Sequence, residues 1–166
     1  MLKIGFIVGL CFLFWVICYL NTGNDQKNMI GFRSYPNEVQ ELVRKDPVLG
    51  KLAPKEINMV KVLITNFILF TVIFLIVGLI IKFTVGFNGF MDAFIYFLVL
   101  GETLNLFDLV VIDLLWWRNT ERIRFSCVRD KKLYQNPSVH IASFSRAIVM
   151  YLMIALLVTA ILTVLP

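Results

Sequence analysis

Charged residues and cysteine are both scarce in this sequence. Asp, Glu, Lys and Arg together make up 16% of the 166 residues, against about 25% in a soluble globular domain. Three cysteines without a CxxC pair are too few for a disulfide-stapled secreted module, and with a single histidine they exclude a classical zinc cluster. The sequence therefore predicts neither a metal nor another cofactor.

The sequence also lacks the short motifs of common enzymes and nucleotide-binding proteins. It contains no GxSxG nucleophile elbow, no HExxH pair, no P-loop and no dinucleotide-binding glycine fingerprint. Membrane topology and anionic lipid account for its basic residues, so we expect no nucleic-acid partner. Whether the protein is an enzyme stays open at this point.

Hydrophobic residues are abundant instead, at 59% of the chain against roughly 45–50% in soluble domains. They gather in four runs, and about 20 apolar residues suffice to cross a bilayer as a helix. We expect an all-α, polytopic membrane protein, a bundle of four transmembrane helices forming a single domain over residues 1–166. The expected spans are residues 4–20, 62–81, 90–117 and 147–166, joined by long loops at 21–61 and 118–146.

The first run is interpreted as a retained anchor. Residues 19–23 offer no small-x-small cleavage site, so a signal peptide is not favoured. Gly5 and Gly9 form a small-xxx-small pair, which lets another helix approach closely. We expect this face to contact a second copy of the chain or a partner subunit.

The basic residues lie mostly on one side of the expected spans. Fourteen of the sixteen Lys and Arg residues fall within 21–61 and 118–146, which leaves Lys3 and Lys82 on the other side. The positive-inside rule therefore predicts that both long loops are cytosolic and that both termini face outward.

Each long loop contains a local helix signal. Residues 36–46 predict a short amphipathic cytosolic helix with Val39, Leu42 and Val43 on one face. Asn136-Pro137 suits a helix start, with the asparagine as cap and the proline in the first turn. The fourth helix is therefore expected to begin before the membrane.

The third expected span carries polar residues at bilayer depth: Glu102, Asn105, Asp108 and Asp113. A charge at that depth costs about 2.5–3.5 kcal/mol on insertion scales, so such residues face protein, water or a partner. At 100° per residue of α-helix the four side chains fall within an arc of about 140°. This polar stripe opens toward the cytosol and indicates a path for a solute or an ion.

Structural roles are the alternative for the same residues. Asp113 lies near the depth at which the fourth helix enters, so Arg146, His140 or Lys61 could pair with it. Glu102 has no basic residue at its depth in another span. It is then protonated, hydrogen-bonded, hydrated or paired across an oligomer.

The only histidine offers a different chemistry. His140 together with Tyr134 and either Asp108 or Asp113 could form an acid–base site at the cytosolic interface. A headgroup contact or a helix cap is the plainer role for a lone interfacial histidine. Anionic lipid headgroups are the expected ligands of Arg122, Arg124 and Arg146.

Residues 105–124, with the letters NLFDLVVIDLLWWRNTERIR, resemble the signature of small four-span membrane proteins of Gram-positive bacteria that are commonly labelled ABC transporter permeases. Tyr134, His140 and the segment 34–40 are also similar to residues of that family. The resemblance covers most of the chain. It implies a multi-pass protein of a bacterial cytoplasmic membrane. It also adds emphasis to seven residues: Asp108, Asp113, Trp116, Arg122, Arg124, Tyr134 and His140.

Three functions remain open from the sequence. The first is a transport-type, permease-like component with an inward-opening acidic stripe on the third span. The second is an interfacial membrane enzyme acting on a lipid or prenyl-type anionic substrate. The third is a regulatory or scaffolding membrane subunit without chemistry of its own.

The predicted orientation is tested by cysteine labelling at positions 25 and 130, one in each long loop. An impermeant thiol reagent added to intact cells should leave both Asp25→Cys and Asp130→Cys unlabelled, because the basic loops are expected inside. Permeabilised cells provide the control, in which both positions react. Labelling of both positions in intact cells would reverse the orientation and the direction in which the polar stripe opens.

Overall fold

The computed structural model describes residues 1–54 and 58–165. Four of its helices are long and apolar enough to cross a membrane. Within the described ranges the β-structure is a single isolated bridge between Phe125 and Val128. The predicted all-α fold with four spans is therefore confirmed.

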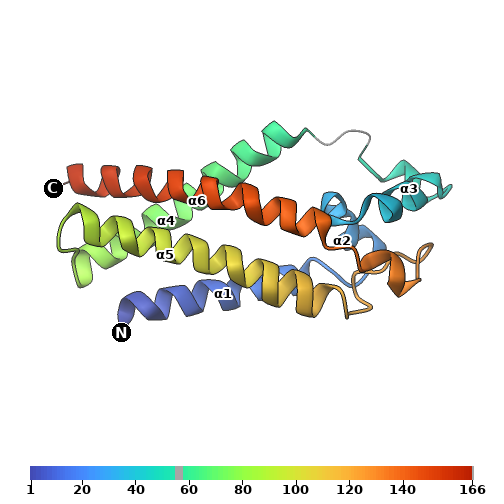
Figure 1. Ribbon diagram of the computed structural model, residues 1–166, viewed down its shortest axis with the longest axis horizontal. Coiled ribbons are helices and arrows are strands. Elements are labelled where there is room, and N and C mark those ends of the chain that lie inside the picture. The colour runs from blue at the N-terminus through green and yellow to red at the C-terminus, as the bar shows by residue number, and fades with distance from the viewer. Residues whose placement is uncertain (55–57, 166) are drawn as a thin grey trace. The chain divides into compact units, whose positions relative to one another are not determined.

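The long helices follow the expected spans with small shifts at their ends. They are α1 (Leu2–Leu20), α4 (Met59–Thr84), α5 (Phe90–Phe107), which continues as the π-helical segment η3 (Asp108–Trp117), and α6 (Ser138–Val164) (Figure 1). The short elements are α2 (Asp25–Ile30), η1 (Phe32–Ser34), α3 (Asn37–Lys45), η2 (Leu49–Lys51) and η4 (Lys131–Tyr134).

Both local helix predictions in the loops are confirmed. The amphipathic helix expected at 36–46 is α3, and it buries Val39 and Val43, whereas Leu42 of the expected face is exposed. The fourth helix begins just after Asn136-Pro137, where the Asn136 Oδ1 atom accepts the backbone N–H of Ser138 at 3.0 Å.

The chain divides into two compact units. The helical unit consists of Met1–Cys11, Asn58–Leu106 and Ser145–Pro166, and the head unit consists of Phe12–Ile57 and Phe107–Phe144. The first unit therefore contains α4, most of α5 and most of α6, whereas the second contains the described parts of both connecting segments and η3.

Two glycines set the helix packing in the helical unit. A Cβ atom added to Gly101 of α5 would lie 2.8 Å from the Tyr151 Cβ atom of α6, and one added to Gly78 of α4 would lie 2.8 Å from the Phe97 ring. Both distances are too short for a side chain, so only glycine permits the approach. Phe74 stacks on Phe97 and Tyr151, with ring centroids 6.0 and 5.9 Å apart.

The beginnings of α1 and α5 are joined by an ion pair. The Lys3 Nζ atom lies 2.9 Å from the Asp92 Oδ2 atom and 4.6 Å from the centroid of the Phe87 ring. On the same helix as Lys3, a Cβ added to Gly5 or Gly9 would meet no other atom within 4 Å. The contact expected at that glycine face stays a prediction.

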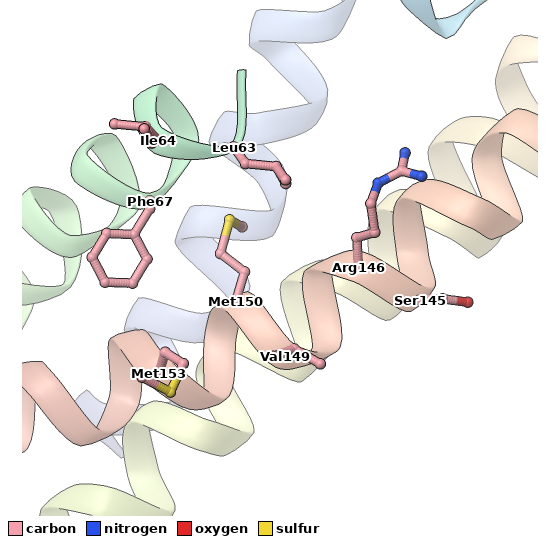
Figure 2. Close-up of a pocket in the computed structure, with 8 residues that line it drawn as sticks. All are labelled: Leu63, Ile64, Phe67, Ser145, Arg146, Val149, Met150 and Met153. Atoms are coloured by element: carbon pink, nitrogen blue, oxygen red, sulfur yellow. The ribbon is translucent and has the colours of Figure 1, made fainter. Parts of the chain in front are cut away.

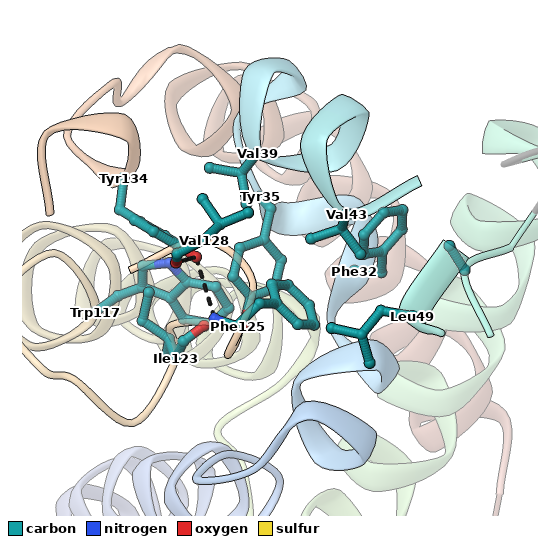
Figure 3. Close-up of a cluster of buried hydrophobic side chains, with 11 residues drawn as sticks. Phe32, Tyr35, Val39, Val43, Leu49, Trp117, Ile123, Phe125, Val128 and Tyr134 are labelled. Carbon is teal, nitrogen blue, oxygen red and sulfur yellow. Dashed lines mark hydrogen bonds between the residues drawn. The ribbon is translucent and has the colours of Figure 1, made fainter. Parts of the chain in front are cut away.

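The two segments expected as loops fold together on a core of their own. Eleven buried side chains form this head cluster (Figure 3). They come from the segment after α1, from the last residue of η3 and from the segment that follows it: Phe32, Tyr35, Val39, Val43, Leu49, Ala53, Trp117, Ile123, Phe125, Val128 and Tyr134. The sequence predicts the helix α3 but not this shared core.

Tyr35 lies at the centre of the head cluster. Its side chain is fully buried, and its ring centroid lies 4.8 Å from that of Phe125 and 5.0 Å from that of Trp117. The Tyr35 hydroxyl donates a hydrogen bond of 2.8 Å to the Ile123 carbonyl. Burial, reinforced by nearby Tyr134, raises the pKa of Tyr35 well above its ordinary value.

Tyr35→Phe should lower the free energy of unfolding of the full-length protein in detergent by about 1–3 kcal/mol, because the Ile123 carbonyl loses its buried donor. The raised pKa adds a pH dependence. The folded state holds the phenolic proton more tightly than the unfolded chain, whose tyrosine pKa is about 10. Stability from this group is therefore complete below about pH 10 and is lost as the pH rises further.

Denaturant titrations at about pH 8 and about pH 11 measure both effects. The loss between the two pH values should be smaller in Tyr35→Phe than in the wild type. Tyr19→Phe is the matched control, because the Tyr19 side chain is exposed on α1. Identical alkaline losses in wild type and Tyr35→Phe would remove Tyr35 as their source.

Candidate functional site

The central feature of the head unit is a buried pair between Asp113 and His140. The His140 Nδ1 atom lies 2.9 Å from the Asp113 Oδ2 atom, and the two side chains are 3% and 13% exposed, respectively. Asp113 belongs to η3, and His140 lies in the first turn of α6, which the cap at Asn136 orients. Of the three partners considered for Asp113, the structure therefore shows His140.

This pair leaves the second imidazole nitrogen available. An ionised carboxylate only accepts hydrogen bonds, so we expect the proton between the two groups on Nδ1. The His140 Nε2 atom is buried and has no hydrogen-bond partner among the described residues. Native proteins leave few buried polar atoms in this condition. With the proton on Nδ1, the Nε2 lone pair is an acceptor.

Trp117 forms one wall of this site. Its ring meets the His140 imidazole edge to face, with centroids 5.8 Å apart. Like the histidine Nε2, the indole Nε1 atom is buried and has no hydrogen-bond partner in the described part of the chain. Trp117 is also a member of the head cluster, so the core of the head fixes one side of the imidazole.

The π-helical geometry of η3 changes the expected arrangement of the two aspartates. An α-helix would place Asp108 and Asp113 about 140° apart. In a π-helix the backbone bonds join residues five apart, so the two residues stack one turn from each other on the same face. Their carboxylates interact electrostatically with each other and with the Cys18 thiol of α1.

Glu102 and Asn105 belong to the helical unit. The Asn105 Nδ2 group donates a hydrogen bond of 3.3 Å to the Glu102 Oε2 atom, and the Glu102 Oε1 atom is buried without a partner among the described residues. The two residues are three positions apart on α5, where side chains are neighbours. Among the alternatives considered for Glu102, a hydrogen bond to an amide is the one observed.

Tyr134 is held by backbone groups of the second connecting segment. Its buried hydroxyl accepts a hydrogen bond of 3.1 Å from the Phe125 backbone N–H and donates one of 2.6 Å to the Val128 carbonyl. Figure 3 shows this hydroxyl beside the turn that the bridge between Phe125 and Val128 closes. The hydroxyl therefore holds the second connecting segment in shape.

Arg122 caps the end of α1. Its Nη2 group donates to the carbonyls of Tyr19 and Thr22 at 3.2 and 3.0 Å, and its guanidinium lies 4.0 Å from the centroid of the Tyr19 ring. A cation at a helix C-terminus interacts favourably with the unpaired carbonyls and the helix dipole. Arg122 was predicted to bind lipid headgroups, but these contacts already use much of its hydrogen-bonding capacity.

The other two arginines differ from Arg122. The Arg124 Nη1 atom lies 3.5 Å from the Glu121 Oε1 atom, in a pair whose glutamate is 88% exposed. Arg146 belongs to the helical unit, where it is exposed and lines an apolar groove.

Two polar residues that sequence analysis did not select also join the connecting segments. Asp25 accepts hydrogen bonds from the Ser126 backbone N–H and hydroxyl at 2.9 and 2.6 Å. Asn28 is buried, and its Nδ2 group lies 3.5 Å from the Arg124 carbonyl. In the sequence, these residues look like the polar first turn of a short helix. Such a pattern indicates a helix cap, and it gives no information about a partner a hundred residues away.

Comparison with known proteins adds no identification. No protein-family model matches the chain, and neither the curated proteins nor the solved structures gave a match. No group of three histidine, cysteine or acidic residues in the described ranges could hold a metal ion. The chemistry of the site therefore has to be inferred from the Asp113–His140 pair and its surroundings.

A double-mutant cycle tests whether the pair is coupled. Asp113→Leu or His140→Phe alone leaves one buried polar partner unpaired, and each should lower the free energy of unfolding by about 3–5 kcal/mol. The double variant should recover most of that loss, since replacing both partners by apolar groups is often nearly neutral. Chemical denaturation in detergent gives the three values.

The contact between Arg124 and the exposed Glu121 is the matched control for this cycle. Glu121→Gln should change stability by less than about 1 kcal/mol, because surface ion pairs contribute little. Simple additivity of the Asp113 and His140 substitutions would show that the two residues are energetically independent.

Proposed function

We propose that this protein is a transport-type component of a bacterial cytoplasmic membrane, and that the Asp113–His140 pair is its proton-handling site. The observation that carries the proposal is the buried imidazole. Asp113 holds it through Nδ1 at 2.9 Å, and its Nε2 atom has no partner within the described residues. In this proposal the Nε2 atom is the position that exchanges the proton.

The position of further acids on the same span supports this function. Glu102 and Asp108 precede Asp113 along the helix that spans Phe90–Trp117. Acidic and histidine side chains inside transmembrane segments are costly, and they commonly mark ion paths or proton relays. The resemblance of residues 105–124 to four-span proteins labelled permeases also favours a transport function.

Partners follow from the same proposal. A proton path that uses the polar side chains of one span needs other helices to form its remaining walls. The face of α1 that carries Gly5 and Gly9 could bind a second copy of the chain or a partner subunit, because a Cβ added to either glycine meets no other atom within 4 Å. The remaining ligands in this proposal are the bilayer itself and anionic headgroups at Arg124 and Arg146.

Proton movement into sealed vesicles tests the proposed function. The purified protein is reconstituted into vesicles that contain a pH-sensitive dye, and a potassium diffusion potential drives protons inward. His140→Gln should reduce the protein-dependent rate by about tenfold or more, because it removes the group that exchanges the proton. Glu102→Gln should also reduce it while leaving stability nearly unchanged, since the amide retains an acceptor for Asn105.

Glu38→Gln is the control in this assay, since Glu38 is an exposed residue of α3. It should leave the rate unchanged. The proposal fails if the wild-type protein moves no protons above the rate of empty vesicles, or if His140→Gln and Glu102→Gln both retain the wild-type rate. A regulatory or scaffolding role would then be favoured.

An interfacial enzyme is the second candidate, and the same pair supports it. A carboxylate that fixes Nδ1 of an imidazole leaves Nε2 as a general base, which is the arrangement used by hydrolases. The substrate class would be an anionic lipid or a prenyl-type compound. Incubation with such lipids followed by mass spectrometry distinguishes the enzyme from the transport component. If the protein is an enzyme, the wild type should yield lipid products that the His140→Gln variant does not form. If it is a transport component, the lipids should remain unaltered.

A further inference from the structure

An apolar groove lies between α4 and α6 in the helical unit. Its volume is about 610 Å³ (Figure 2). Eight residues line it: Leu63, Ile64, Phe67, Ser145, Arg146, Val149, Met150 and Met153. None of these is acidic and only two are polar, so the groove combines an apolar wall with one positive charge.

The lining follows one face of each helix. On α6, Val149, Met150 and Met153 are three, four and seven residues after Arg146, which is the spacing of a single helical face. At a rise of 1.5 Å per residue this face extends about 10 Å from the arginine. The facing wall comes from Leu63, Ile64 and Phe67 of α4.

The charge stands at one end of this face. In Figure 2 Met150 and Met153 extend from α6, Leu63 and Phe67 from α4, and the Arg146 guanidinium lies beyond Met150 toward the start of α6. Arg146 is exposed. The sequence places it immediately before the apolar run that begins at residue 147, which corresponds to the level of lipid headgroups.

We propose that this groove is a binding site for an anionic membrane phospholipid, with one acyl chain along the methionines and the phosphate at Arg146. The apolar wall fits a hydrocarbon chain, and flexible methionine side chains adapt to its shape. The lone cation selects a lipid with net negative charge over a zwitterionic one. This proposal rests on the headgroup contact proposed above for Arg146, and it is independent of the proton handling because it uses none of the residues of the Asp113–His140 pair.

Photolabelling with two lipids tests the proposal. The full-length protein is reconstituted with phosphatidylglycerol or phosphatidylcholine, each carrying a photoactivatable group on one acyl chain, and mass spectrometry locates the labelled peptides. Phosphatidylglycerol should label the peptides around Phe67 and Met150 about fivefold more than phosphatidylcholine, the preference expected from one basic residue at the surface. Arg146→Gln should abolish that preference.

Two further variants separate charge from shape. Lys61→Gln removes an exposed cation of α4 that does not line the groove, so the preference should persist. Met150→Trp fills the groove and should reduce labelling by both lipids. Equal labelling of the wild type by the two lipids, an unchanged preference in Arg146→Gln, or crosslinks to a second copy of the chain in place of lipid would each overturn the proposal.

Discussion

A carboxylate on an apolar helix needs a partner, and in the head unit that requirement is met by one contact. Asp113 and His140 meet at 2.9 Å with both side chains largely buried. Breaking such a contact from one side leaves an uncompensated polar group in a low dielectric. The contact therefore fixes where η3 lies against the start of α6, and the proposed proton handling depends on it.

The head cluster gives this contact its rigidity. Trp117 is both a member of the cluster and a neighbour of the His140 ring, and Tyr35 packs on Trp117 while its hydroxyl bonds to the Ile123 carbonyl. Arg122 and Asp25 then attach the second connecting segment to the end of α1 and to α2. The segments between the spans thus form a folded unit that supports the site. A mutation in the core of this unit should therefore change the position of the His140 imidazole.

Much of the fold follows from the sequence because the relevant signals are local. Four apolar runs of sufficient length predict four helices, the pattern around Val39 and Val43 predicts α3, and Asn136-Pro137 predicts the start of α6. Asp113 could be selected because a charge at membrane depth is costly, and His140 because it is the only histidine and lies where the fourth helix enters the membrane.

The remaining features depend on contacts that a one-dimensional pattern does not contain. The hydrogen bond from Tyr35 to Ile123 and the cap that Arg122 provides for α1 join residues about a hundred positions apart. The π-helical geometry of η3 depends on packing. In an α-helix Asp108 and Asp113 would lie at opposite ends of the polar arc, whereas in the π-helix they lie on the same face. Tyr134 and Arg122 were selected for chemistry because residue type alone does not show that their polar groups already have backbone partners.

The most direct test of the Asp113–His140 contact uses the fact that the chain has a single histidine. Nitrogen NMR of the isotope-labelled protein in lipid nanodiscs reports which imidazole nitrogen carries the proton, with no other histidine signal present. When the ring is neutral, the proton should reside on Nδ1, and in Asp113→Asn this preference should weaken or reverse because the carboxylate acceptor is lost. A neutral wild-type ring with its proton on Nε2, or a signal that is identical in Asp113→Asn, would contradict the arrangement on which the proposed proton handling depends.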